Sequence, residues 1–208
     1  CNAITDVPGV EVGYATLIAG EGPLVVGRGP VRTGVTAIHP RGRADPGTPC
    51  AAGFFSLNGN GEMTGTVWIE EAGSLSLPVT ITNTHSVGIA HESTIAWLAE
   101  PHPQLANVWA LPVVAETWDG YLNDINGFHV KTEHVFQALD SAHSGPVEEG
   151  NVGGDVQVRT EAVEQLGCAT DAKIKALRLL PGQRERHSRL YLDGEIARMC
   201  GQWSAEQD

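Results

Sequence analysis

The sequence predicts a layered α/β or α+β domain, and two observations lead to this prediction. Short apolar, β-branched runs end in turns that are rich in Gly, Asn and Asp, as strands do. Helical stripes alternate with these runs or follow them, and the clearest repeats at i, i+3, i+4 and i+7 in Val135, Ala138, Leu139 and Ala142. Such an order builds a sheet with helices packed against it. We expect residues 1–154 to hold a mixed sheet with helices on one side.

The individual elements follow from local patterns, in chain order. Strands are expected where apolar runs stop at turn residues, at 10–14, 34–39, 50–57, 77–83 and 108–115. The stretches 20–30 and 41–49 are loops, the second because it is rich in Gly, Pro and Arg. Helices are expected at 62–71, ending at Gly73, at 87–99, and around the Val135 stripe.

Composition limits the class of protein. With 208 residues, 41% hydrophobic, 18% charged and 25 glycines, the chain is typical of a compact, turn-rich globular protein. It contains no run of 18 apolar residues, so no membrane helix is expected. Residue 1 is Cys and no basic-then-apolar leader follows, which favours a fragment or a processed product. Four widely spaced cysteines without a CxxC pair predict reduced thiols and a cytoplasmic setting.

The charge distribution says what kind of ligand to expect. A net charge of −12 argues against nucleic acid, because a phosphate backbone needs a basic surface. No Lys or Arg occurs between Arg43 and Lys131, while nine acidic residues fall in that interval. If this interval lines a cleft, its field favours a cationic ligand such as a free amino group. The alternative is a solvated acidic face that keeps the protein soluble.

Composition changes after Gly154, which predicts a boundary. Residues 1–154 hold 21 of the 25 glycines and 5 of the 13 basic residues, and residues 155–208 hold the other 4 and 8. The second part is expected to form two or three short helices, one of them capped by Thr170. It is either a small subdomain or a sequence foreign to the preceding fold.

Three apolar runs end in polar clusters, at residues 54–65, 79–88 and 111–127. We expect them to converge on one pocket; the alternative is that they are ordinary polar turns. The amides can donate to a carbonyl or a developing oxyanion: Asn58, Asn60, Asn83, Asn123 and Asn126. The acids can bind an ammonium group: Glu62, Glu116, Asp119 and Asp124. Tyr121 or Trp118 would close the pocket.

Three other chemistries are not supported. His85 and Ser86 are adjacent, and neighbours on an extended strand point to opposite faces, so they do not form a catalytic pair. The eight histidines show no HExxH arrangement, so no metal site is predicted. The stretch 150–154 lacks the spacing of either phosphate-binding loop.

Several long motifs carry a resemblance to a known family. They lie in unbroken order over about residues 1–154, at 2–13, 33–38, 53–65, 68–71, 81–88, 112–120 and 149–154. Together they resemble the DmpA and β-peptidyl aminopeptidase family, peptidase family S58, which are self-processing L-aminopeptidase D-amidase/D-esterases. The resemblance implies an αββα sandwich whose precursor cleaves itself into an α and a β chain. It implies no metal or organic cofactor, and oligomeric assembly.

The resemblance also implies a chemistry: hydrolysis of N-terminal residues from peptides, amides or esters that carry a free amino group. The nucleophile would be the N-terminal serine of the β chain, with its own α-amine as the base. Two departures stand out in this chain. After Gly154 the sequence no longer resembles the family, so the nucleophile has no counterpart here. A family tyrosine that stabilises the oxyanion falls in or near residues 116–123; the family commonly has tyrosine where this chain has Trp118, and Tyr121 is the other possible counterpart.

These observations lead to one expectation with an alternative. We expect an α-chain-like portion of such an aminopeptidase, inactive alone and needing a β chain or an oligomer. Within it, Glu116 and Asp119 belong to the amino-group pocket, Trp118 or Tyr121 lies on the oxyanion side, and the remaining substrate-binding residues are Asn58, Asn60, Glu62 and Asn123. The alternative is a truncated or rearranged homologue that acts, if at all, as a binding protein.

Overall fold

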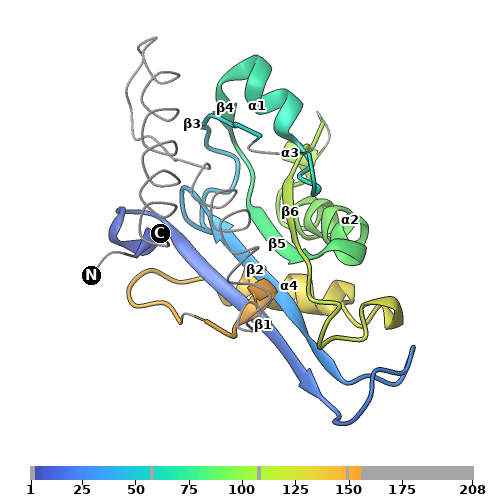
Figure 1. Cartoon of the computed structure of the whole chain (residues 1–208). Helices are drawn as coiled ribbons and strands as arrows, with labels where there is room; N and C mark the ends of the chain where they lie inside the picture. The colour runs from blue at the N-terminus through green and yellow to red at the C-terminus, as the bar shows by residue number, and fades with distance from the viewer. Residues whose placement is uncertain (1–2, 57–58, 107–108, 149, 156–208) are drawn as a thin grey trace, which may run out of the picture.

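A four-stranded mixed sheet forms the centre of the chain (Figure 1). The computed structural model describes residues 3–56, 59–106, 109–148 and 150–155. The strands run in the order β1-β2-β5-β6 and are β1 Glu11–Ala19, β2 Val31–His39, β5 Val79–Asn83 and β6 Val113–Thr117. β2 is antiparallel to β1 and to β5, whereas β5 and β6 are parallel. The prediction of a mixed sheet is confirmed.

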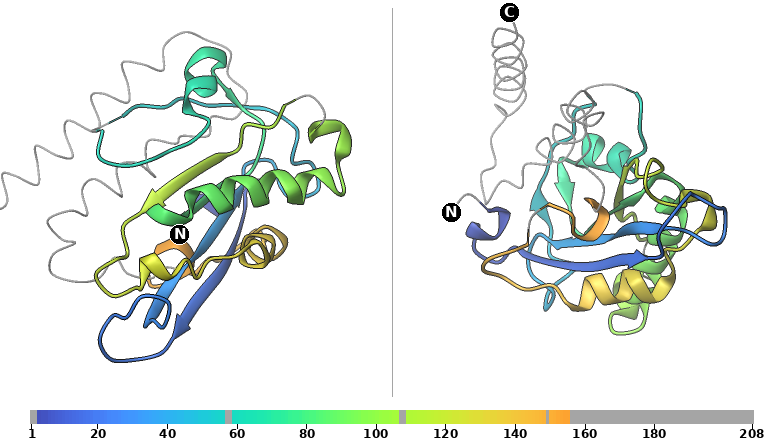
Figure 2. Two further views of the ribbon diagram at one scale, coloured as in Figure 1. Left: turned by 90° about the vertical axis from the view of Figure 1, so that its right-hand side faces the viewer. Right: turned by 60° about the horizontal axis from the view of Figure 1, so that its bottom comes forward.

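Two helices cover one face of this sheet (Figure 2). They are α2, Val87–Ala99, whose bounds match the predicted helix, and α4, Thr132–Asp140, which carries the predicted stripe. A short helix, α3 at Pro103–Ala106, follows α2. The core between helices and sheet is mainly apolar and includes Val35, Ala37, Val114, Trp97, Leu98, Val135, Ala138 and Leu139. Alternate residues of each strand point to this face, as the two-residue period of a strand requires.

The opposite face has its own cluster and corrects part of the prediction. Here Ile69 of α1, Thr66–Ala72, packs with Val79, Ile81 and Val113. The helices therefore do not all lie on one side, because α1 buries its single apolar anchor against the face that α2 and α4 leave free. The strand expected at 50–57 is only β3, Cys50–Ala51, because its partner β4, Ser74–Leu75, offers two residues to pair with.

A short glycine segment crosses this second face, seen in orange in Figure 2. It is the 3₁₀ turn at Gly153–Asp155, and threonine hydroxyls from three strands hold its backbone. Gly153 N–H donates to Thr16 Oγ1 (2.9 Å), and Gly154 N–H donates to Thr36 Oγ1 (3.1 Å). Thr117 Oγ1 donates to the Gly154 carbonyl (2.7 Å). The segment singled out by its glycines is thus a strap on the sheet.

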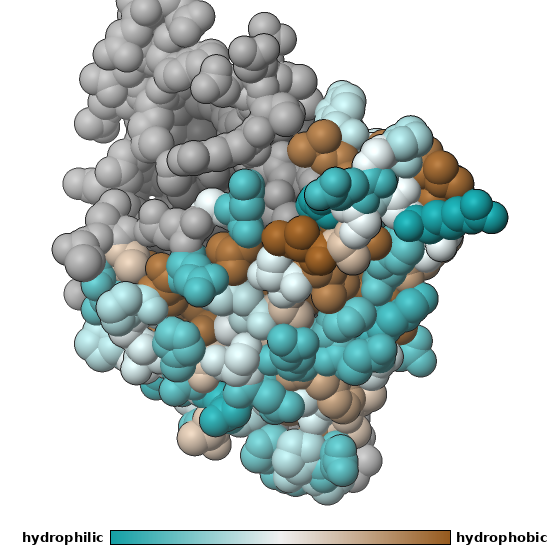
Figure 3. All heavy atoms as spheres, turned by 90° about the horizontal axis from the view of Figure 1, so that it is seen from below, coloured by the Kyte–Doolittle hydropathy of each residue, from teal (hydrophilic) through white to brown (hydrophobic). Residues whose placement is uncertain are grey.

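The surface seen from below is mostly hydrophilic, with apolar residues gathered in separate patches (Figure 3). Several large apolar side chains are more than half exposed, among them Trp109, Trp118, Tyr121 and Phe128. Within the described residues, no helix is long and apolar enough to cross a membrane. The tail helix expected after Thr170 lies outside the described residues.

One buried histidine makes the fold sensitive to pH. Burial lowers the pKa of His39, against a backbone hydrogen bond and the charge of Glu11, which raise it. Its Nε2 lies 3.0 Å from the Leu139 carbonyl, and its Nδ1 is buried with no partner among the described residues. The folded state therefore keeps His39 neutral at a pH where the unfolded chain takes up a proton.

We expect the free energy of unfolding to fall as the pH drops below about 6.5, the ordinary pKa of histidine. The sign follows from the lowered pKa, since the stability is complete above the unfolded-state pKa and is lost below it. His39→Gln can keep a donor toward Leu139 without titrating, so this variant should lose less stability between pH 7 and pH 5. Urea unfolding at several pH values measures both slopes. Equal slopes would show that other groups carry the dependence.

Candidate active site

The carboxyl ends of β5 and β6 meet at one edge of the molecule and bring two of the three polar clusters together. The strands are parallel and in register, with Asn83 beside Thr117. Beside this pair, the Thr84 hydroxyl donates to the Glu116 carboxylate and lies 3.2 Å from the Thr117 carbonyl oxygen. Side chains at such strand ends are held by the sheet behind them, which suits a site that needs fixed geometry.

Three aromatic rings lie in contact at this edge. The His85 ring meets Trp118 edge-on, with centroids 6.0 Å apart and an interplanar angle of 82°. The same ring stacks on Phe128 at 6.2 Å and 27°. His85 is exposed, whereas Ser86, its neighbour in a 3₁₀ turn, is 1% exposed. One side chain therefore faces solvent and the other the interior, which does not suit a catalytic pair. The two residues lie in a 3₁₀ turn and not in the extended strand that the sequence suggested.

The third polar segment runs along the free edge of β6. Met63 forms an antiparallel bridge with Ala115, and the Thr64 N–H donates to the Val114 carbonyl (3.0 Å). In an antiparallel pair, the chain before Met63 leads toward the carboxyl end of β6. This places exposed Glu62 and Asn60 on the side of Glu116. Asn58 lies outside the described residues.

Asp119 and Asn123 belong to a buried network instead of facing solvent, and each is 2% exposed. Asn123 Nδ2 donates to Asp119 Oδ1 (3.0 Å), and Asn123 Oδ1 accepts from the Arg32 backbone N–H (3.0 Å). Beside them, Asn83 Nδ2 donates to Thr33 Oγ1 (2.8 Å). Burial raises the pKa of the Asp119 carboxyl, and the neighbouring Thr33 hydroxyl and Asn123 amide oppose that rise. Asp119 Oδ2 and Asn83 Oδ1 find no partner with hydrogen-bonding geometry among the described residues.

Asp124 fastens the same loop to the loop before β2. Its Oδ2 accepts from the backbone N–H groups of Gly27 (2.7 Å) and Gly29 (3.2 Å) and lies 2.9 Å from His129 Nε2. Burial raises the pKa of this carboxyl, but the hydrogen bonds from His129 and the two glycines outweigh it, and the pKa lies below its ordinary value. Asp124, which the sequence suggested as a ligand for an ammonium group, therefore has hydrogen-bond partners within the protein.

The sequence-derived candidates divide into two groups. Those that face solvent are Glu116, which is half-buried, Trp118, which is 52% exposed, and Tyr121 of the loop after β6, which is 58% exposed. Those turned inward are Asp119 and Asn123, which hold the loop that carries the aromatic residues. Sequence reasoning missed two residues at the edge, His85 as a ring partner and Phe128. Nothing in the sequence marks Phe128, since its place depends on how the loop folds back.

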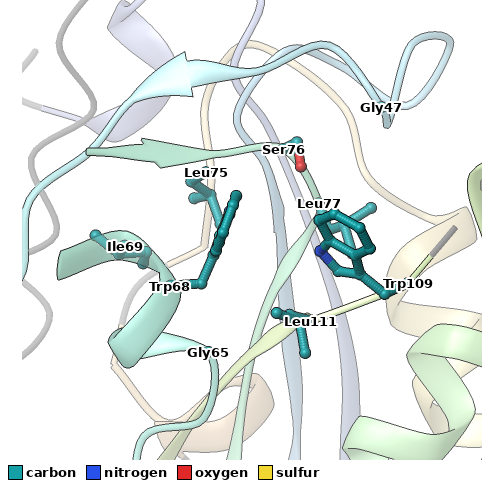
Figure 4. A pocket seen from close by; sticks show the side chains of 9 residues that line it. All are labelled: Gly47, Gly65, Trp68, Ile69, Leu75, Ser76, Leu77, Trp109 and Leu111. Carbon is teal, nitrogen blue, oxygen red and sulfur yellow. The ribbon is translucent and has the colours of Figure 1, made fainter. Parts of the chain in front are cut away.

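A second hollow lies at the other end of β6 (Figure 4). Trp68 of α1 and Trp109 face each other edge to face, with centroids 5.9 Å apart, and Leu75, Leu77 and Leu111 line the same hollow. Ser76 contributes a side-chain hydroxyl to its lining. Among the described residues that line it, none carries an acidic or amide side chain.

No cluster of three or more His, Cys, Asp or Glu side chains is arranged to hold a metal ion in the part of the chain that the structure describes. What the exposed edge does offer is a carboxylate, a threonine hydroxyl and aromatic rings. These groups suit the binding of an amine-bearing ligand and the donation of a hydrogen bond to a carbonyl oxygen.

Solved structures define the class of protein. The chain resembles the L-aminopeptidase D-Ala-esterase/amidase from Ochrobactrum anthropi, described as a prototype for the serine aminopeptidases with a variant of the Ntn hydrolase fold. The two are 51% identical with a TM-score of 0.68, over 74% of this chain and 43% of that one. A β-aminopeptidase from Burkholderia sp. matches at 51% identity and a TM-score of 0.67, over 74% of this chain and 42% of that one.

The sequence comparisons give the family. The family model described as Peptidase family S58 matches residues 2–162, so the chain belongs to peptidase family S58. Two β-peptidyl aminopeptidases BapA are relatives, 60% identical in Sphingosinicella microcystinivorans and 50% identical in Sphingosinicella xenopeptidilytica. Each match covers 74% of this chain but only 38% of the relative. The predicted resemblance is confirmed, and the chain spans well under half of these relatives.

Proposed function

We propose that residues 1–154 form the α-chain-like part of an aminopeptidase of the N-terminal-nucleophile type with an αββα sandwich. The meeting of Glu116, Thr84 and Trp118 at the carboxyl ends of two parallel strands carries this proposal, because it joins an acid and a hydrogen-bond donor in a chain of family S58. The reaction would be hydrolysis of an N-terminal residue from a peptide, amide or ester. No metal or organic cofactor is required.

Each residue at this edge then has a part in binding or polarising the substrate. The Glu116 carboxylate receives the substrate's ammonium group, and its hydrogen bond with Thr84 fixes its direction. Asp119 adds negative charge from beneath, without contact. Trp118 through its indole N–H, or Tyr121 through its phenol, donates to the carbonyl oxygen as charge develops there. Asn60 and Glu62 line the wall, and buried Asn123 holds the loop behind it. Asn58, which lies outside the described residues, stays a sequence-based candidate for the same wall.

The attacking group is expected from a segment outside these 208 residues. An N-terminal serine would attack the carbonyl carbon, the amine or alcohol would leave, and water would release the acyl group. The sheet face that carries the Gly153–Gly154 strap is the one on which a second sheet of the sandwich would pack. A β chain, or further copies of the protein, would be the partners.

We expect the isolated chain to release no p-nitroaniline from amino-acid p-nitroanilides, to leave β-peptides intact and to show no self-cleavage on a gel. The reason is that binding groups alone do not supply the nucleophile. Turnover by these 208 residues would contradict the proposal and would direct the search to Ser56, Ser86 and Thr84.

A chimera tests the positive half of the proposal. Residues 1–154 replace the matching part of the relative from Sphingosinicella microcystinivorans, which is 60% identical there. The chimera should process itself and hydrolyse the same substrates, and Glu116→Gln in it should lower kcat/KM by about tenfold or more. A chimera that folds as the relative does but neither processes nor turns over would contradict the assignment.

One observation favours a second candidate, a non-catalytic binding protein. The family match ends at residue 162, and 46 residues follow it. If those residues replace the catalytic segment in the natural protein, the chain keeps an amine-binding edge without a reaction. Binding of amino-acid amides by the natural chain, together with a gene that encodes no serine-led segment downstream, would decide for this candidate.

A further inference from the structure

The contact of His85 with Trp118 and Phe128 is not explained by the proposed chemistry, which uses only Trp118. We propose that these three rings form an aromatic platform that receives the apolar side chain of an amine-bearing substrate, with Phe128 and His85 as specificity-determining residues. This inference rests on the proposed function, because it takes the Glu116 edge as the place where the substrate's ammonium group binds.

The three rings contact one another at the edge, but they are not buried in the core. Phe128 is 55% exposed and Trp118 is 52% exposed, and His85 between them is also exposed. Exposed aromatic rings that already touch one another lose little freedom when a further ring or alkyl group is laid on them. Such a surface therefore binds apolar groups at low entropic cost.

The backbone at Phe128 supports a functional reason for this residue. Its φ is +51° and its ψ is +51°, a left-handed conformation that is unfavourable for a bulky side chain. The surrounding loop holds it there, since the Gly127 N–H donates to the Asp124 carbonyl (3.0 Å) and His129 follows with its contact to Asp124. Glycine would adopt this conformation without strain. A bulky ring held in this conformation at an exposed position supports a functional role for the ring.

Chain geometry places the platform beside the acid. Thr84, which donates to Glu116, is adjacent to His85 in sequence, and Trp118 is two residues beyond Glu116. A ligand that places its ammonium group at Glu116 therefore has its side chain within reach of the rings. Charge agrees with this ligand, because the segments that form this edge, 84–86 and 116–128, contain acidic residues but no Lys or Arg. The ligand class is an α- or β-amino acid amide with an aromatic or branched apolar side chain.

The decisive variant is Phe128→Gly in the full 208-residue chain. It removes the ring and relieves the left-handed strain. Its Tm should therefore be no lower than that of the unchanged chain, and up to a few degrees higher. The probe is phenylalaninamide, titrated by calorimetry, with glycinamide to remove the side chain and N-acetylphenylalaninamide to remove the ammonium group. We expect phenylalaninamide to bind about tenfold more weakly to Phe128→Gly, and glycinamide to be unaffected by the substitution.

A matched control separates the platform from general aromatic stickiness. Trp109→Ala removes another exposed ring, 60% exposed, at the far end of β6 and should leave phenylalaninamide binding unchanged. Equal affinity of Phe128→Gly and the unchanged chain would overturn the platform, as would an equal loss in Trp109→Ala or no binding to the unchanged chain.

Failure of the proposed function gives a different result. If N-acetylphenylalaninamide binds as tightly as phenylalaninamide and Phe128→Gly weakens both, the platform stands and the ammonium role of Glu116 falls. If Glu116→Gln abolishes binding of phenylalaninamide while Phe128→Gly leaves it intact, the ammonium role stands and the platform falls.

Discussion

Gly34→Ala is expected to lower the free energy of unfolding by about 3 kcal/mol, among the largest effects of a single methyl group in this chain. A Cβ at Gly34 would lie well inside van der Waals contact with the carbonyl oxygens of Ala15 and Gly153. Both are backbone atoms, so neither moves without disturbing β1 or the strap. Gly154→Ala should behave similarly, because its Cβ would lie 2.5 Å from the Ile81 carbonyl oxygen. Urea unfolding followed by circular dichroism measures both.

Gly88→Ala is the matched control for these substitutions. Gly88 lies in α2, and a Cβ there meets nothing within 4 Å. Alanine is the better helix former, so this variant should gain a few tenths to about 1 kcal/mol. If Gly34→Ala and Gly88→Ala changed the free energy of unfolding by the same amount, the packing of Gly153 and Gly154 on the sheet would not require a glycine at position 34.

Much of the fold could be predicted from sequence because its elements follow local rules. The stripe of Val135, Ala138 and Leu139 has the helical period, and all three are buried against the sheet. The helix at 87–99 lies where its composition indicated. The length of β3 could not be predicted, because an apolar run such as residues 50–57 forms a strand only as far as a partner is available to pair with it.

The candidate site was predicted less completely, since chemistry in the sequence does not say which way a side chain points. Glu116, which is half-buried, and Trp118, which is exposed, lie at the same edge. Asp119 has the same chemistry as Glu116 but turns inward, because the loop after β6 folds back onto the start of β2 through Asn123. Phe128 reaches the edge only because that loop places it there. Hydrogen bonds of the Asn123 side chain to Asp119 and to the Arg32 backbone N–H hold this loop, and no local pattern encodes the contact with Arg32.

Asn123→Ala is expected to lower the free energy of unfolding by about 2 to 3 kcal/mol, whereas Asp119→Asn should raise it at pH 7. Loss of the Asn123 side chain leaves the Arg32 N–H and Asp119 Oδ1 buried without partners. Asp119→Asn keeps an oxygen for Asn123 Nδ2 and removes a buried charge. The new side-chain NH₂ group would replace Asp119 Oδ2 near the Thr33 hydroxyl. The oxygen of that hydroxyl already accepts one hydrogen bond, from Asn83 Nδ2.

The pH dependence distinguishes these two roles. Because burial raises the pKa of Asp119 in the folded state, its contribution to stability declines as the pH rises above about 3.9, the ordinary value for aspartate, and on through the folded-state pKa. Asp119→Asn should abolish this decline, and Asn123→Ala should retain it at lower overall stability. Urea unfolding between pH 4 and pH 8 measures both curves. A destabilised Asp119→Asn would mean that the network needs the charge itself. A stabilised one would mean that the chain tolerates a costly carboxylate beneath the Glu116 edge, where its negative field favours a bound ammonium group.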